Sequence, residues 1–224
     1  MTLPEQEFTR EGIKALVNSA TTFLGKLVNP PMEELGELLA DQVRFFRYKN
    51  QVRILSKARE LLEREKVDPQ RVSLKILVPI LEAGSIEENE DMINRWAALL
   101  ATAANPGSSI SVKPSFPEIL KELSPKDALI LDKIYEMVIS IPIPREEWSR
   151  RGAVGISIKV ACGLSDQEFE IAIDNLYRLR LCAPPSTSLE FIDNKQHRFQ
   201  LQTKDLICLT DFGCVFVAAC RKRV

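Results

Sequence analysis

The chain has little of the chemistry from which enzymes and metal sites are built. Its 224 residues include one histidine, His197, and none of its five cysteines belongs to a CxxC pair. No GxxxxGKS/T phosphate loop, GxSxG or HExxH motif occurs. Catalysis and metal binding both need a convergent set of reactive groups. The sequence therefore predicts a protein that is not an enzyme, with no catalytic, cofactor-binding or metal-binding residues, and a solvated His197.

The chain also lacks a charge excess and a long apolar run. Its formal net charge is -1 and its isoelectric point is about 6.0, without the basic excess of most nucleic-acid binders. No apolar segment reaches the roughly 18 to 20 residues that span a bilayer, and no signal peptide is expected. The cysteines lie in apolar segments, where we expect buried thiols in a reducing cytoplasm: Cys162, Cys182, Cys208, Cys214 and Cys220.

Helical periodicity dominates the first half of the chain. Hydrophobic residues make up 45% of the sequence and charged residues 27%, which is the composition of a globular protein. Apolar residues at helical spacing predict an amphipathic helix over about 9–28 and one long helix over about 32–66. The prolines at 30–31 separate them. We expect residues 1–122 to form an all-helical bundle and residues 123–224 to form a second domain.

Capping signals mark the starts of the later helices. Asp68 with Pro69 predicts one start, and Ser85 with Glu88 forms a predicted capping box for the next. The acidic run at 87–91 lacks the alternating ligands and the glycine of a calcium loop. We therefore interpret it as negative charge placed at a helix N-terminus. The same signal recurs in three later pairs: Ser115 with Glu118, Ser124 with Asp127, and Ser165 with Glu168.

The second domain combines helices with short strands. A helix from Pro125 is followed by a short apolar helix at 156–163 and by a longer helix after Ser165. Two short segments around a turn at 193–196 predict a β-hairpin, and residues 206–220 predict a strand that runs into an apolar helix. This is the element order of a winged helix-turn-helix. The predicted fold class is mainly α, with a helical bundle followed by a C-terminal winged helix.

Three segments carry a resemblance to a known family. They are LVPILEAGSIEENEDMINRWAALLATAANP, PSFPEILKELSPKDALILDKI and LTDFGCVFVAAC. From about Arg44 to the C-terminus the chain resembles the bacterial abortive-infection alpha (Abi-alpha) family, most specifically in three motifs: Trp96-Ala97-x-Leu99-Leu100, Pro114-Ser115-Phe116 and Leu209-Thr210-x-Phe212-Gly213. The resemblance implies a role in phage resistance, in which an infected cell stops supporting the virus, and it brings no catalytic residue. The loop 142–155 matches no pattern of the family.

A run of basic residues lies in the predicted long helix. Six cations occur over 44–59 with no acidic residue among them, and Lys49, Arg53 and Lys57 share a helix face. Such a stripe can meet phosphates or anionic lipid headgroups. The simpler interpretation is a solvated face of a helix whose aromatic residues are buried. The candidate stripe consists of Arg44, Arg47, Lys49, Arg53 and Lys57.

The second helix of the predicted winged helix argues against the usual mode of DNA binding. Arg178 and Arg180 come too late to read bases from the helix N-terminus. The start of the helix would face closely spaced phosphates, yet it carries four acids: Asp166, Glu168, Glu170 and Asp174. A packing or protein-docking module is therefore the favoured interpretation.

Three functional hypotheses follow. The first is a non-enzymatic phage-defence protein that acts through protein–protein contacts with an unidentified partner. The alternatives are a winged-helix transcriptional regulator that binds DNA, and a peripheral membrane effector, although the helix at 9–28 has few basic residues on its polar face.

We also expect self-association through residues 9–66, most simply as a dimer, because so long an apolar stripe needs partners. The alternative is a break near Asn50-Gln51 that folds the helix back within a monomer.

Overall fold

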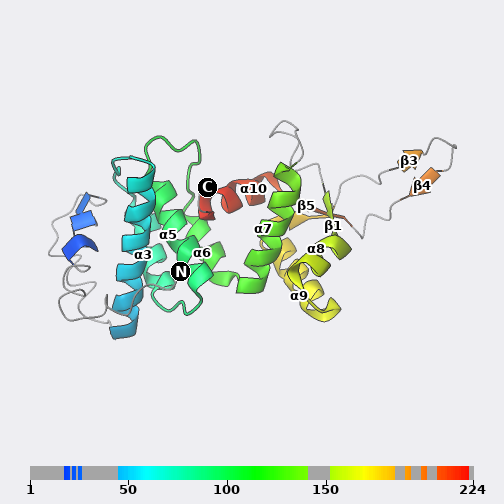
Figure 1. Cartoon of the computed structure of the whole chain (residues 1–224), viewed down its shortest axis with the longest axis horizontal. Helices are drawn as coiled ribbons and strands as arrows, with labels where there is room; N and C mark the ends of the chain where they lie inside the picture. The colour runs from blue at the N-terminus through cyan, green and yellow to red at the C-terminus, as the bar shows by residue number, and fades with distance from the viewer. Residues whose placement is uncertain are drawn as a thin grey trace. The chain divides into compact units, whose positions relative to one another are not determined.

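The computed structural model describes residues 18–20, 22–23, 25–26, 45–140, 152–184, 190–192, 198–200 and 206–221 (Figure 1). The described part of the chain is mainly helical, as the sequence predicts, and it includes a small three-stranded antiparallel sheet. The chain divides into two compact units. The N-terminal unit is Met1–Glu122 with Ala219–Val224, and the C-terminal unit is Leu123–Ala218.

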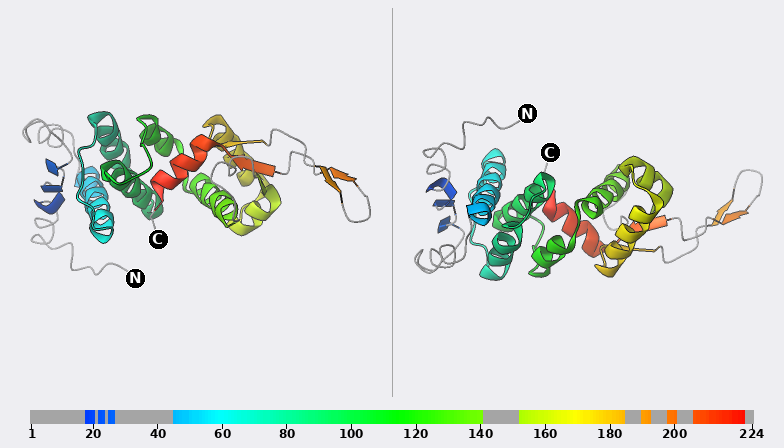
Figure 2. Two further views of the ribbon diagram at one scale, coloured as in Figure 1. Left: turned by 90° about the horizontal axis from the view of Figure 1, so that it is seen from above. Right: turned by 90° about the horizontal axis from the view of Figure 1, so that it is seen from below.

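The N-terminal unit is built on two long helices that lie side by side (Figure 2). These are α3 (Phe45–Arg64) and α5 (Glu90–Ala104). Spacing of four residues brings Ile54, Ala58 and Leu62 to one face of α3, and all three are buried. Helix α5 buries an almost unbroken apolar run around Trp96, which is 1% exposed. The shorter helices α4 (Leu74–Gly84) and α6 (Ser115–Glu122) complete the unit.

Helix α3 continues through Asn50 and Gln51, so the predicted alternative of a break there is wrong. The amide of Asn50 donates to the backbone carbonyls of Ser85 and Glu87, at 3.2 and 2.6 Å. The amide of Gln51 donates to the carbonyl of Leu81 at 3.3 Å. These bonds satisfy polar groups that are nearly fully buried. The two amides therefore fasten α3 to the end of α4 and do not interrupt it.

The rest of the predicted N-terminal helices is only partly described. Residues 18–20, 22–23 and 25–26 are helical, within the predicted helix at 9–28. Ala20 and Phe23 are buried there, at 3% and 4% exposed. Residues 32–44 of the predicted long helix lie outside the described residues.

Two predicted helix starts are wrong. Helix α4 begins at Leu74 and not at Pro69, because the Gln70 N–H bonds to the Ala104 carbonyl at the end of α5 (2.8 Å). That bond holds the segment after α3 out of a helix. Ser85 and Glu88 form no capping box: the cap of α5 is Asn89, whose side chain accepts from the N–H groups of residues 91 and 92 at 3.0 and 3.1 Å.

The start of α6 is also shifted. The helix begins at Ser115 itself, so Ser115 lies within the first turn and not, as predicted, at the cap before it. It buries Phe116 and Leu120.

Close packing fixes the turn between α4 and α5. A β-carbon on Gly84 would lie 2.5 Å from the Ile54 side chain and 3.2 Å from the Trp96 ring. A larger residue at this position would require the Ile54 side chain to shift, so a glycine suits the point where the three helices meet. Pro79 lies inside α4.

The C-terminal unit alternates helices with short strands. Its helices are α7 (Pro125–Ile139), α8 (Gly155–Cys162), α9 (Asp166–Arg178) and α10 (Asp211–Cys220). The strands β1 (Gly152–Val154), β5 (Leu206–Leu209) and β2 (Cys182–Ala183) form an antiparallel sheet with β5 in the middle. The predicted hairpin is present as β3 (Glu190–Ile192) and β4 (Arg198–Gln200), with Phe191 opposite Phe199.

Two predicted capping boxes are confirmed. Ser124 and Asp127 exchange their bonds at 3.2 and 2.8 Å, and Ser165 and Glu168 do so at 3.3 and 3.0 Å. Between α8 and α9, Gly163 takes a left-handed conformation with φ 64°, which closes α8. These local signals fix the starts of α7 and α9.

All five cysteines are described and carry thiols, not disulfides. Four are buried, as expected, and Cys162 is half-buried. Burial raises the pKa of the Cys182 thiol, so it stays protonated and packs as a small apolar group.

None of the described helices is both long enough and apolar enough to cross a bilayer.

Candidate functional site

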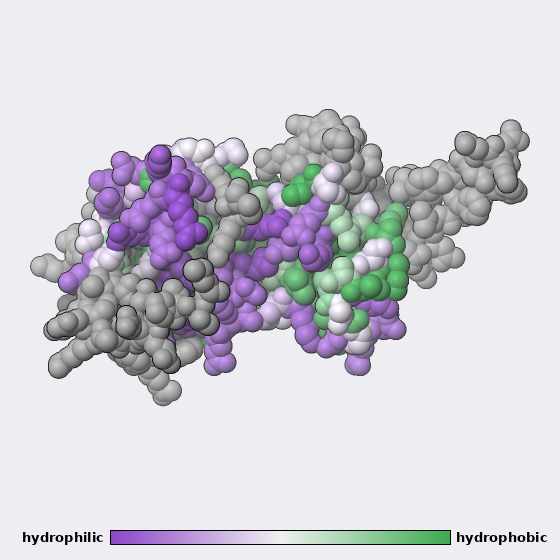
Figure 3. Space-filling model, viewed as in Figure 1, coloured by the Kyte–Doolittle hydropathy of each residue, from purple (hydrophilic) through white to green (hydrophobic). Residues whose placement is uncertain are grey.

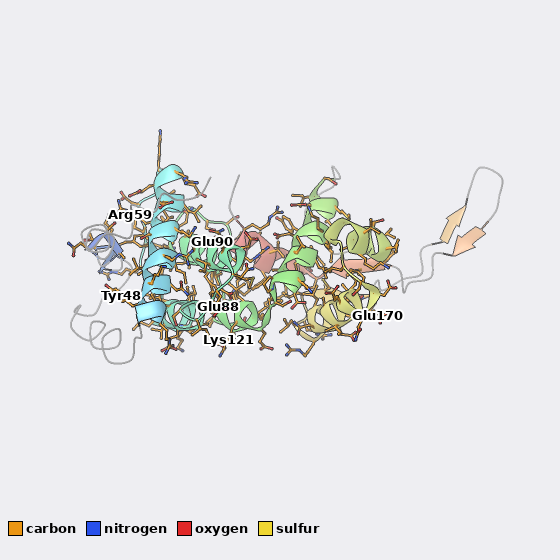
Figure 4. All side chains as sticks on the ribbon, turned by 60° about the horizontal axis from the view of Figure 1, so that its bottom comes forward. Tyr48, Arg59, Glu88, Glu90, Lys121 and Glu170 are labelled. Atoms are coloured by element: carbon orange, nitrogen blue, oxygen red, sulfur yellow. The ribbon has the colours of Figure 1, made fainter. Side chains whose placement is uncertain are left out.

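The predicted basic stripe lies on α3, and several of its cations form ion pairs or hydrogen bonds with neighbouring side chains. Arg53 and Lys57 both form ion pairs with Glu90, the second at 2.8 Å. Glu90 lies at the start of α5 (labelled in Figure 4). The Arg47 guanidinium donates to the Ser85 hydroxyl at 3.0 Å. Lys49 is half-buried on the same helix. The sixth cation of the run, Arg59, pairs with Glu63 at 2.6 Å, and Arg44 lies outside the described residues.

Glu90 is the electrostatic centre of this group. Partial burial raises the pKa of Glu90, but the hydrogen bonds and charges of Lys57 and Arg53 outweigh burial and hold it below its usual value. One carboxylate thus faces two cations, and the stripe is partly neutralised within the unit. An anion that bound here would compete with Glu90. Binding of nucleic acid or lipid by the stripe stays a prediction.

Acidic residues at 87–91 interact with backbone N–H groups of their own segment or lie in the first turn of α5. The carboxylate of Glu87 accepts from the N–H groups of Glu88 and Asn89, at 3.0 and 2.9 Å. Glu90 and Asp91 occupy the first turn of α5, where the helix dipole favours negative charge. Among the described residues, no three His, Cys, Asp or Glu side chains are arranged to hold a metal ion. His197 lies outside that part of the chain.

The C-terminal unit has a groove between α8 and α9. It has a volume of about 510 Å³. Two parallel rows of α9 line it, each with a spacing of four residues, so they run along the helix next to each other. One row is aromatic and apolar: Phe169, Ile173 and Tyr177. The other row is acidic: Asp166, Glu170 and Asp174.

The opposite wall of the groove is formed by Gly155, Ile156 and Lys159 of α8, with Ile207 of β5. Gly155 and Ile207 are buried, and the Lys159 cation is half-buried. Ile156 is 58% exposed, and Val160, one turn further along α8, is 71% exposed. Figure 3 shows hydrophobic residues gathered over α8 on this face of the unit. Exposed branched side chains this close together are a feature of interaction surfaces.

The acids of α9 fall into two kinds. Asp166 pairs with Lys159 of α8, and Glu168 pairs with Lys126 of α7 at 2.5 Å. Glu170 (Figure 4) and Asp174 form no ion pair with any residue that the structure describes.

Two pKa shifts define the charge state around the groove. The Lys126 ammonium and the Ser165 cap lower the pKa of Glu168 to about 2, so it is charged in all but strong acid. Burial raises the pKa of Tyr177 to about 12, so the phenol stays neutral. The surface therefore combines an apolar strip, a neutral hydroxyl and uncompensated negative charge.

Sequence reasoning identified the four acids of α9 and missed the groove. The available signal was α8 itself, whose apolar residues Ile156, Ile158 and Val160 alternate. In a helix, alternation cannot place all of them on one face, and only Ile158 is buried. An apolar helix without a stripe must expose part of its apolar surface.

Comparison with known proteins gives one match. The family model of abortive infection alpha matches residues 42–220, a range that contains every element from α3 to α10. No curated protein matches the chain, and no solved structure matches it. The match covers both units and all three motifs on which the resemblance was based. The chain belongs to the abortive infection alpha family.

Proposed function

We propose that this chain is a cytoplasmic phage-defence protein of the abortive-infection type that acts without catalysis, by binding another protein through the α8–α9 groove. Family membership suggests the defence role. The observation that carries the binding mode is the groove itself, with exposed Ile156 beside the unpaired acids of α9.

In this proposal the C-terminal unit is a winged helix-turn-helix. Three features support it. The element order is α7, β1, α8, α9, β2, a hairpin, then β5. The last strand lies between the first two in the sheet. A tight turn at Gly163 separates α8 from α9, as in a helix-turn-helix. In this reading α9 occupies the place of a recognition helix.

The chemistry of α9 favours a protein partner over DNA. Asp166, Glu170 and Asp174 lie in one row along the exposed side of the helix. A duplex carries a negative charge about every 1.7 Å of its axis, so this row would repel it. Apolar side chains beside the row favour a protein surface, since winged helices serve different functions on one scaffold.

The proposal is tested by phage challenge of a susceptible bacterium that expresses the full chain. Wild type should protect against part of a broad phage panel. Ile156→Ser should lose most of that protection, because it removes an apolar anchor from the groove. Ile86→Ser is the matched control: Ile86 is 59% exposed but lies in the N-terminal unit.

Two outcomes would overturn the proposal. If wild type never differs from an empty vector across the panel, the defence role is wrong. If Ile156→Ser protects as well as Ile86→Ser at equal protein levels, the groove is not the acting surface.

A further inference from the structure

The α8–α9 groove has a shape that suits a helix. Its apolar floor is a strip along α9, formed by Phe169, Ile173 and Tyr177, with Ile207 beside it. From Asp166 to Tyr177 the lining along α9 extends about 16 Å, at 1.5 Å per residue. A helix of two to three turns covers that length. Amphipathic helices commonly bind in such grooves through apolar anchors at positions i, i+3 or i+4, and i+7.

The charge along the groove indicates what charge a bound helix would carry. Glu170 and Asp174 are exposed, are one turn apart and have no ion-pair partner among the described residues. The other two acids of α9 are already neutralised by Lys159 and Lys126. Negative charge therefore remains on the rim that adjoins the apolar strip. Lysine or arginine side chains one turn apart on a bound helix would meet it.

The basic helix of a second copy does not fit this description. Arg53 and Lys57 of α3 are held by Glu90 of their own chain. The apolar face of α3, with Ile54 and Ala58, is buried within the N-terminal unit. Because its cations are paired and its apolar face is buried, α3 of a second copy has no apolar face with which to bind the groove.

We propose that the groove binds a basic amphipathic helix of a partner protein, with its apolar side chains on the Phe169–Ile173–Tyr177 strip and its cations against Glu170 and Asp174. The inference rests on the proposed function, because it names the chemistry of the partner for the same surface. The neutral phenol of Tyr177 offers a hydrogen bond at the end of the strip.

The probe is a labelled helical peptide of about 14 residues made of leucine and lysine, with leucine at i, i+3 and i+4. Binding to the full-length protein is measured by fluorescence anisotropy. A second peptide of equal composition in scrambled order and a third with glutamate in place of lysine are the peptide controls. Wild type should bind the lysine peptide at least about 10-fold more tightly than either control, and binding should weaken from about 50 to 500 mM salt.

The protein variants isolate the rim charge. Glu170→Gln with Asp174→Asn should weaken binding of the lysine peptide at least about 10-fold. Glu82→Gln with Glu88→Gln removes the same charge from exposed positions of the N-terminal unit and should leave binding within about twofold. Equal binding of the glutamate peptide, or unchanged binding by the Glu170/Asp174 variant, would overturn the inference. So would binding of duplex DNA or of phosphatidylglycerol vesicles that Ile156→Ser abolishes.

Phage protection separates this inference from the proposed function. If Ile156→Ser loses protection while the Glu170/Asp174 variant keeps it in full, the groove acts but its partner is not basic. If Ile156→Ser keeps protection, the proposed function itself fails, whatever the peptide does.

Discussion

Gly213, in the first turn of α10, lies directly against the backbone carbonyl of Leu181. A β-carbon on Gly213 would stand 2.9 Å from the carbonyl carbon of Leu181 and closer still to its oxygen. Thr210 holds the same junction from the other side: its hydroxyl donates to the Arg180 carbonyl at 2.7 Å and accepts from the Gly213 N–H at 2.8 Å. The Leu209-Thr210-x-Phe212-Gly213 motif is thus a strand-to-helix junction that is packed against backbone.

Gly213→Ala should destabilise the protein by about 3 kcal/mol, because backbone atoms cannot move aside as a flexible side chain can. Gly163→Ala is the control. A β-carbon there meets nothing within 4 Å, and only the left-handed φ of 64° opposes it, at about 1 kcal/mol. Urea unfolding followed by circular dichroism measures both. Equal losses of stability would mean that the contact with Leu181 is not the constraint.

Glu90→Gln should destabilise the N-terminal unit by about 0.5 to 1 kcal/mol at neutral pH, because Glu90 is half-exposed and solvent screens its pairs with Arg53 and Lys57. The folded pKa of Glu90 lies below its ordinary value of 4.5. Its contribution to stability is therefore fully present above about pH 4.5 and is lost as the pH falls through the folded pKa.

Unfolding of wild type and Glu90→Gln at a series of pH values tests this. The two stabilities should converge in acid and differ at neutral pH. Glu88→Gln is the control: Glu88 is exposed and forms no ion pair within the described part of the chain, so its substitution should change little. A difference that persists unchanged into strong acid would contradict the assigned role of the carboxylate.

The Glu168 carboxyl should titrate near pH 2 in NMR spectra of the folded protein. Lys126→Met should raise that midpoint toward the ordinary value of 4.5, because the Lys126 hydrogen bond is the main cause of the shift. Lys121→Met, at an exposed position of the other unit, should leave it unchanged. Since the folded pKa is lowered, the stabilising contribution of Glu168 is present above pH 4.5 and is lost as the pH falls toward 2. If the midpoint in Lys126→Met stayed near pH 2, the Ser165 cap alone would account for the lowered pKa of Glu168.

Self-association through residues 9–66 stays a prediction, and light scattering on the full chain tests it. We expect a dimer at tens of micromolar. Within one chain, Phe23 and Leu62 already line one pocket, and α5 covers the Ile54–Ala58 face of α3. A truncated chain that starts after α3 would expose Trp96 and is a poor test for this reason. A monomer by light scattering on the intact chain would refute the dimer.

Local rules predicted the elements whose interactions are local. The boxes at Ser124 and Ser165 each depend on two residues three apart, and both are present. The box at Ser85 failed because Ser85 is the C-cap of α4, with φ −65° and ψ −24°, and its hydroxyl donates to the Glu82 carbonyl at 2.6 Å. Arg47 and Asn50 of α3 bind the same residue, and the cap of α5 is Asn89. The contacts from α3 lie outside any window of a few residues.

The candidate sites divide in the same way. The basic stripe was visible because its cations share one helix. Its neutralisation was not, because Glu90 comes from a helix 37 residues further on. The groove was missed because it exists only where α8 and α9 meet. The neutralised stripe and the groove both arise where two helices pack together. Sequence periodicity describes one helix at a time, so it could predict neither.

The last two residues of α10, Ala219 and Cys220, belong to the N-terminal unit, where the Thr102 hydroxyl of α5 donates to the Ala219 carbonyl at 3.0 Å. During synthesis, the ribosome must therefore release the whole of residues 123–218 before the unit that was started first can be finished. Until then Thr102, which is 7% exposed in the folded chain, has no acceptor from α10. The N-terminal unit is thus begun first, but it cannot be complete until residues that follow the C-terminal unit have been made.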